Sequence, residues 1–266
     1  MRLHNTLDRY HDRPSSIHDL DPRVKVVVTL LGIFSVLWLP DGAWGAYGLV
    51  WCMVLAVALV AQLGVGLVLR RSLVALPFAL VAITLVFTLP GQTLFTLQLG
   101  GWEIRASDAG LVRFGSVLVR SWLSVQMAIL LVATTRIPDL LHALRHLRVP
   151  ALLVTILAFM VRYLSVLVDE VTRLLRARQA RSAASAQGKA GGSLLWRARV
   201  AGNMAGQLFL RSLERSDRIY SAMLARGFRG QYVTVNPHRM RRRDWLALGV
   251  ALAALGMLQW LGRALS

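Results

Sequence analysis

The chain has 266 residues, of which 56% are hydrophobic and only 17% are charged, and its mean hydropathy is +0.54. Soluble domains carry about a quarter charged residues, so this composition excludes an ordinary soluble protein. Apolar stretches near the length that crosses a bilayer recur along the sequence. They predict an all-α, polytopic integral membrane protein with about five to six transmembrane helices.

The net charge is +18, from 31 basic and 13 acidic residues, and it is unevenly distributed. Residues 173–243 contain 16 basic side chains and 2 acidic ones, which leaves +14 in this segment. Basic residues gather in the cytoplasmic loops of membrane proteins because they resist translocation. The distribution therefore indicates one cytoplasmic block, and it accounts for the high charge without nucleic acid as a partner.

The chain is expected to begin with a cytoplasmic segment, residues 1–23, because these residues are polar and no signal-peptide cleavage site follows. Asp21 and Pro22 are typical of a helix start, with Asp as N-cap and Pro at the first helical position. The first span is expected over residues 24–39 and ends at Pro40-Asp41-Gly42, a turn signal.

Further spans are expected over residues 44–63, with a tail to Arg71, and over 73–89 and 111–135. Residues 91–108 are mixed in polarity and suit an outer loop. Residues 24–135 thus form a helical bundle in the membrane. The last apolar stretch, 245–262, gives residues 244–266 as a C-terminal transmembrane helix, with Trp245 and Trp260 as interfacial anchors.

The apolar stretch 151–168 is expected not to span, because the segments on both sides of it are basic and read as cytoplasmic. Its helical pattern continues to about residue 186, with apolar residues on one face and arginines between them. A Gly-rich connection, 182–193, separates it from a second amphipathic helix, 194–226, which Gly227 caps. Residues 136–243 are therefore assigned to a cytoplasmic region built on two long basic helices.

The sequence lacks the usual signatures of an ATPase, a proton-driven transporter or an enzyme. Gly188-Lys189 is followed by Ala190 where a P-loop needs Ser or Thr. No acidic residue lies well inside an apolar span, where a proton relay would need one. No catalytic constellation, cofactor site or metal site is assigned. The seven-residue spacing of His4, His11 and His18 allows metal ligation, and so does the pair His142 and His146, but polar structural roles are favoured.

Three arginines interrupt apolar runs: Arg113, Arg120 and Arg162. Arg113 lies near a helix end and can snorkel. The other two cost about 2.5–3.5 kcal/mol each on insertion scales, so they are expected to face protein, headgroups or each other.

The two basic helices end in similar tripeptides, Ala180-Arg181-Ser182 and Ala225-Arg226-Gly227. Small neighbours allow close approach, and a guanidinium can bind a carboxylate or carbonyls in a groove. This pattern favours docking to a cytoplasmic partner, although anionic lipid headgroups are also expected to bind the basic helices.

With these motifs placed, the sequence resembles the transmembrane T component of energy-coupling factor (ECF) transporters, specifically the cobalt-type CbiQ family. The resemblance runs over nearly the whole chain. It includes residues 7–10 (LDRY) and 18–25 (HDLDPRVK), Arg162-Tyr163-Leu164 before the first tripeptide, and residues 211–216 (RSLERS) before the second.

The resemblance implies a non-catalytic subunit of the bacterial inner membrane whose two coupling helices cross and dock into two ABC ATPase subunits. Ala180, Arg181, Ser182, Ala225, Arg226 and Gly227 would form the ATPase contacts. The substrate, cobalt, would be captured by a separate membrane S component, possibly with a small accessory membrane subunit.

Alternatives remain at the sequence level. A T component could serve nickel, biotin or another vitamin through a different S component. From another class, a membrane-anchored basic scaffold or a nucleic-acid-binding protein would use the same +14 segment, with steeply salt-dependent binding.

Overall fold

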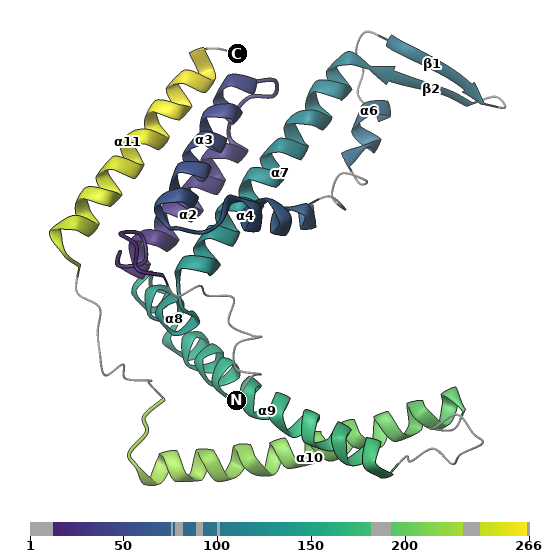
Figure 1. Ribbon diagram of the computed structural model, residues 1–266, viewed down its shortest axis with the longest axis vertical. Helices are drawn as coiled ribbons and strands as arrows, with labels where there is room; N and C mark the ends of the chain where they lie inside the picture. The colour runs from purple at the N-terminus through teal and green to yellow at the C-terminus, as the bar shows by residue number, and fades with distance from the viewer. Residues whose placement is uncertain are drawn as a thin grey trace. The chain divides into compact units, whose positions relative to one another are not determined.

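The computed structural model describes residues 13–75, 77, 82–88, 93–99, 102–181, 193–230 and 240–264. These residues fall into two compact units. One contains the two longest helices, α9 (Ala151–Arg181) and α10 (Leu194–Ala225). The other, here called the bundle unit, contains the remaining helices and one hairpin (Figure 1). The predicted helical class is confirmed.

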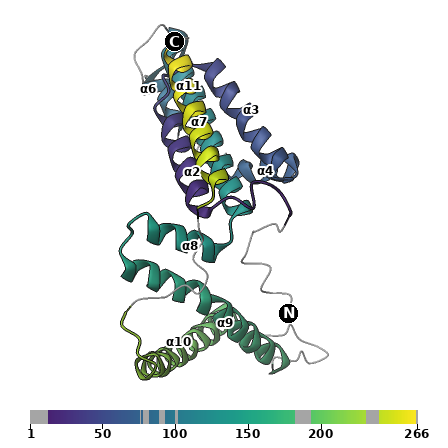
Figure 2. The same ribbon diagram turned by 90° about the vertical axis from the view of Figure 1, so that its left-hand side faces the viewer.

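The bundle unit is built on α2 (Pro22–Leu37), α3 (Trp44–Val60), α7 (Asp108–Thr134) and α11 (Arg242–Ala264). These four helices pack against one another (Figures 1 and 2). Its buried core includes Val36, Tyr47, Val50, Leu123 and Leu258, contributed by all four helices.

By length and composition, three described helices can cross a membrane: α7, α9 and α11. The apolar helix α3 is shorter. Large apolar side chains also cover the outside of these helices, among them Leu59 on α3 and Trp260 on α11, which are 63% and 70% exposed. Such a surface is stable only where lipid or another protein covers it, because exposed apolar area in water is costly. The chain is an integral membrane protein.

The expected second span is interrupted. Helix α3 ends at Val60, and Gln62 adopts the left-handed backbone conformation with φ of 53°. A separate helix, α4 (Val65–Ser72), follows and carries Arg70 and Arg71 in its last turn. The predicted tail to Arg71 was therefore wrong as a continuous helix, since the turn at Gln62 separates α3 from the helix that carries the arginines.

The stretch expected to be a third span is described only in part. A 3₁₀ turn, η1 (Leu73–Ala75), follows α4, and a short helix, α6 (Thr84–Thr88), lies farther on. The expected outer loop forms an antiparallel hairpin of β1 (Thr93–Leu99) and β2 (Trp102–Ser107), with Leu97 opposite Ile104. Helix α8 (Ile137–His146) follows α7.

The predicted N-cap of the first helix is confirmed, and it also joins two helices. The Asp21 carboxylate accepts a hydrogen bond from the Arg23 amide at 2.9 Å, and the Asp21 amide donates to Asp244 Oδ1 of α11 at 3.0 Å. Lys25 Nζ donates to the carbonyl oxygens of His18 and Thr134, at 2.9 and 3.1 Å. Residues 21–25 thus fasten the start of α2 to α11 and to the end of α7.

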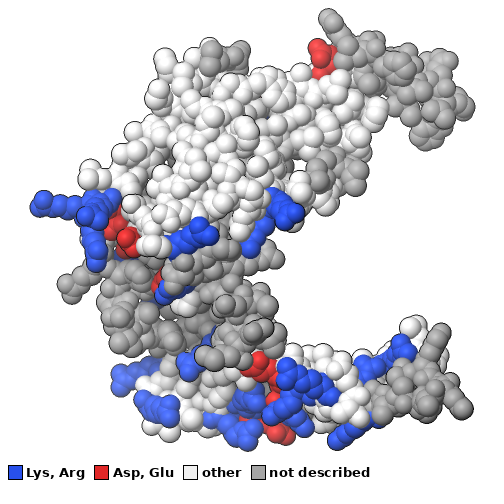
Figure 3. Space-filling model, in the orientation of Figure 1, with Lys and Arg blue, Asp and Glu red and all other residues white. Residues whose placement is uncertain are grey.

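Arg120 faces protein, as predicted. On the face shown in Figure 3, the lysines and arginines of the bundle unit gather at one end of its helices, whereas Arg120 lies within α7. Its guanidinium pairs with Asp41 at 2.7 Å, and it donates to the Tyr47 hydroxyl at 2.9 Å and to the Leu39 carbonyl at 2.5 Å. Three polar partners offset the cost of placing this charge in an apolar helix.

Candidate functional site

The two arginines singled out by the sequence both lie at helix C-termini within the same unit. Arg181 is the last residue of α9, and Arg226 is the C-cap of α10. Both are exposed, as are Ala180 and Ala225. Ser182 lies outside the described residues. A guanidinium at the C-terminal end of a helix is favourably placed, because the helix dipole is negative there.

The end of α10 is a well-formed Schellman cap. Gly227 has φ of +80°, its amide donates to the Leu224 carbonyl at 2.9 Å, and the Phe228 amide donates to the Met223 carbonyl at 3.0 Å. A residue with a side chain is strained in this conformation, which explains Gly at this position. The predicted cap is confirmed. It turns the chain sharply after Arg226 and folds Phe228 back onto the helix.

The two helices cross, as Figure 2 shows, and an ion pair lies between them. Glu170 of α9 has a side chain only 8% exposed, and its Oε1 accepts a hydrogen bond from Arg211 Nη1 of α10 at 2.7 Å. Arg173, one turn along α9, binds the other carboxylate oxygen. The carboxylate is thus shared between two guanidiniums, and it joins α9 to α10 where the helices cross.

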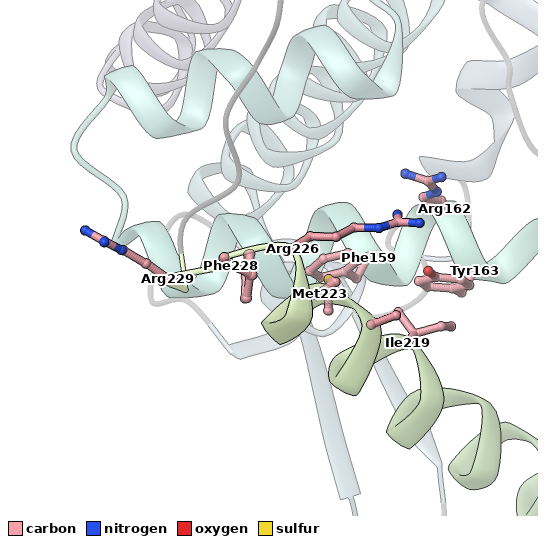
Figure 4. Close-up of a pocket in the computed structure, with 10 residues that line it drawn as sticks. Phe159, Arg162, Tyr163, Ile219, Met223, Arg226, Phe228 and Arg229 are labelled. Carbon is pink, nitrogen blue, oxygen red and sulfur yellow. The ribbon is translucent and has the colours of Figure 1, made fainter.

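One groove lies between α9 and the C-terminal end of α10, and is here called the Arg226 groove (Figure 4). Its volume is about 770 Å³. The Phe159 ring stacks on Tyr163 with centroids 6.2 Å apart and meets the edge of Phe228 at 6.4 Å. The full lining is Phe159, Arg162, Tyr163, Ile219, Ala222, Met223, Arg226, Gly227, Phe228 and Arg229.

A second groove lies between the C-terminal end of α9 and the N-terminal half of α10, and is here called the Arg181 groove. Its volume is about 310 Å³. The lining residues are Leu174, Ala177, Arg178, Arg181, Trp196, Val200 and Met204.

The two grooves have the same chemistry. Each combines at least two arginines with aromatic and aliphatic side chains and one methionine, Met223 or Met204. Among the described residues that line either groove there is no carboxylate. An arginine fork beside apolar surface suits a partner segment that presents a carboxylate next to an apolar side chain.

The histidines do not form a metal centre among the residues that the structure describes, where no group of three or more His, Cys, Asp or Glu is placed to hold an ion. The rings of His142 and His146 are tilted against each other with centroids 4.7 Å apart, and the side chains of His18 and Ser15 share a hydrogen bond of 2.6 Å. His4 and His11 lie outside the described residues.

Two contributors to the site were not foreseen from the sequence. Arg162 was noted as a charge in an apolar run and as part of a segment shared with the family, but not as a groove residue, yet it lines the Arg226 groove. Glu170 was noted only for lying at the end of an apolar stretch. Its contact with Arg173 could have been predicted, because the two residues are three positions apart on one helix. Its contact with Arg211 could not, because Arg211 is 41 residues away in the sequence.

Comparison with known proteins then decides the family. The family model described as CbiQ, cobalt transport protein, matches residues 13–236. This chain belongs to the CbiQ family. Two of its relatives are energy-coupling factor transporter transmembrane proteins EcfT. The one from Lacticaseibacillus paracasei is 27% identical, over 95% of this chain and 96% of the relative. The one from Thermanaerovibrio acidaminovorans is 28% identical over 97% of both.

A third relative matches less than half of this chain. The nickel permease LarQ of Lactiplantibacillus plantarum is 34% identical over 45% of this chain and 41% of its own length. With full-length matches to two transporter membrane proteins, this CbiQ-family chain is an energy-coupling transmembrane component of the ECF type.

Proposed function

We propose that the chain is the T subunit of an ECF importer and couples ATP hydrolysis by two ABC ATPase subunits to uptake through a separate S component. The observation that carries this proposal is the pair of grooves, each beside a helix C-terminus with one motif arginine, Arg181 or Arg226. Two grooves of the same chemistry suit two ATPase subunits of the same fold. The subunit itself would be non-catalytic.

In this mechanism the arginines transmit movement. Each ATPase would hold one guanidinium in a carboxylate-bearing groove of its own, with Ala180, Ala225 and Gly227 allowing close approach and Ser182 completing the first motif. Closure of the ATPase pair on ATP would then move the ends of α9 and α10. The ion pair between Glu170 and Arg211 would carry that movement through the crossing to the bound S component.

The proposed cargo is cobalt. The family model is described as a cobalt transport protein, which supports this ion. Nickel is the second candidate, because a nickel permease is 34% identical over 45% of the chain. Uptake of radioactive cobalt and nickel by cells that express the complete transporter would separate the two. Transport of nickel alone would replace the cobalt assignment.

The proposed location is the bacterial inner membrane, with the N-terminus and residues 136–243 in the cytoplasm. The +14 segment at 173–243 supports this orientation through the positive-inside rule. Residues 151–168 would then lie along the membrane rather than cross it.

Replacing Arg226 with Glu tests the coupling role. Charge reversal should abolish co-purification of the ATPases from mild detergent, or abolish uptake, while the protein still inserts in the membrane. Arg176→Glu is the matched control, because Arg176 is exposed on α9 and lines neither groove. Wild-type uptake by the Arg226→Glu variant would contradict the proposal. A silent Arg226→Lys would instead indicate simple attraction to lipid headgroups, since Lys lacks the guanidinium fork.

A further inference from the structure

The Arg226 groove contains a second guanidinium, Arg162, which lies outside the two tripeptides assigned to ATPase contact. We propose that Arg162 and Arg226 together bind one carboxylate-bearing segment of the ATPase that docks at the end of α10, so that α9 takes part in both docking sites. This inference rests on the proposed function and adds a recognition residue and the chemistry of its partner.

The geometry brings the two arginines together from different helices. Figure 4 shows the Arg226 side chain reaching across Phe159 toward Arg162 and Tyr163, whereas Arg229 points away at the opposite end of the groove. Arg162 lies on the same face of α9 as Phe159, three residues earlier, so the stacked rings and the guanidinium border one surface.

The charges in this groove lack an internal counterpart. In the part of the chain that the structure describes, the groove is lined by Arg162, Arg226 and Arg229 and by no carboxylate. Both Arg162 and Arg226 are exposed. Guanidiniums that face each other repel, so an anion between them is attracted by both. A carboxylate meets this requirement in a bidentate manner, and the floor of Phe159, Tyr163 and Phe228 suits an apolar residue beside it.

The second groove has an equivalent pair. Arg178 and Arg181 both come from α9 and lie opposite Trp196 of α10. Each groove therefore has two neighbouring arginines beside an aromatic ring. In the Arg226 groove, one of these arginines comes from α9 and the other from the end of α10. Arg162 and Arg181 are 19 residues apart on α9, roughly 28 Å at the helical rise. One helix would therefore contact both ATPases.

Site-specific photo-crosslinking in the complete, purified transporter tests the assignment. A photoreactive residue is placed at position 162, 226 or 176 in turn. Positions 162 and 226 should capture the same ATPase subunit, through peptides that contain Asp or Glu, and position 176 should capture far less. Capture of ATPase at 226 but only of phospholipid or S component at 162 would overturn the inference and leave the proposed function standing. Failure at both positions would overturn the two together.

Charge variants give an independent measurement. Arg162→Glu should lower retention of the ATPase by about three- to tenfold at low salt, and the difference from wild type should shrink as salt is raised, because charge pairs near a surface are screened. Arg162→Lys should retain part of the binding. Arg176→Glu provides the control at another exposed position of α9. Equal ATPase retention by the Arg162→Glu and Arg176→Glu variants would contradict a specific role for Arg162.

Discussion

Arg120 illustrates at the scale of one residue how the protein holds a charge inside an apolar helix. Its side chain is 15% exposed and pairs with Asp41, which lies in the turn before α3. The same guanidinium approaches the Tyr47 ring at 5.8 Å. A single arginine therefore joins α7 to the turn at 40–42 and to α3.

Replacing Arg120 with Leu should lower the free energy of unfolding by about 2–4 kcal/mol, because Asp41 loses its closer guanidinium and the Tyr47 hydroxyl and the Leu39 carbonyl lose a donor. Thermal unfolding in detergent measures the loss. Arg113→Leu is the matched control, since Arg113 is 54% exposed and lies 3.8 Å from the same carboxylate. That variant should change stability by at most about 0.5 kcal/mol. Equal effects of both substitutions would show that Arg120 is not a structural anchor.

The role of a single residue can be predicted from the sequence when the groups it contacts are only a few positions away. Asp21 as N-cap and Gly227 as C-cap are readable from the sequence, because capping involves backbone groups within a few positions. The contacts of Lys25 with Thr134 and of Glu170 with Arg211 join residues far apart in the sequence. No short-range pattern specifies them, so these partners required the structure.

At the scale of helices, the crossing of α9 and α10 depends on one buried carboxylate. This carboxylate, Glu170, pairs with Arg211 across the crossing, and much of each helix is exposed. The Glu170 ion pair is therefore expected to restrict the angle at which the helices cross. Arg211 is 53% exposed, so the pair restricts orientation more than it stabilises the fold.

Glu170→Gln should widen the range of distances between the two helices. Spin labels at Leu175 on α9 and Gln207 on α10, in a Cys52→Ser background, would measure this range by pulsed electron resonance. Asp169→Asn is the neighbouring control, because Asp169 is exposed. An unchanged distance distribution in Glu170→Gln would mean that packing alone fixes the crossing.

Most helices could be predicted, because hydrophobic periodicity is a strong signal over long segments. The expected ranges 111–135 and 194–226 match α7 and α10 closely. The break at Gln62 and the hairpin after α6 were missed. Gln has no marked preference for positive φ, so the break had no clear signal. Residues 102–107 (WEIRAS) do alternate between apolar and polar side chains, so a strand signal was present for β2 and was overlooked.

The whole molecule poses a question of topology, since α9 is long and apolar enough to span while the charge distribution argues against it. Accessibility of introduced cysteines in intact cells would settle it. Cys52 is exposed and must be replaced first, for example by Ser.

Cysteines at Leu147 and Arg176, on either side of the apolar stretch 151–168, should both be protected from an impermeant thiol reagent outside the cell. A cysteine at Thr96 in β1 should be labelled from outside, because this hairpin is expected on the outer side. If Leu147→Cys and Arg176→Cys are labelled from opposite sides of the membrane, α9 spans it. One of the two segments that flank 151–168 would then lie outside the cell and not, as proposed, in the cytoplasm.

The arginines that line the two grooves, with no carboxylate among the described lining residues, also affect how quickly the transporter assembles. Two concentrated positive surfaces on one subunit raise the rate at which acidic partners encounter it, and they repel a second copy of the same subunit. The association rate should consequently fall as ionic strength rises and the Debye length shortens toward about 8 Å in physiological salt. Order of assembly would thus follow from charge alone: each subunit of this protein meets its cytoplasmic partners before it meets another of its own kind.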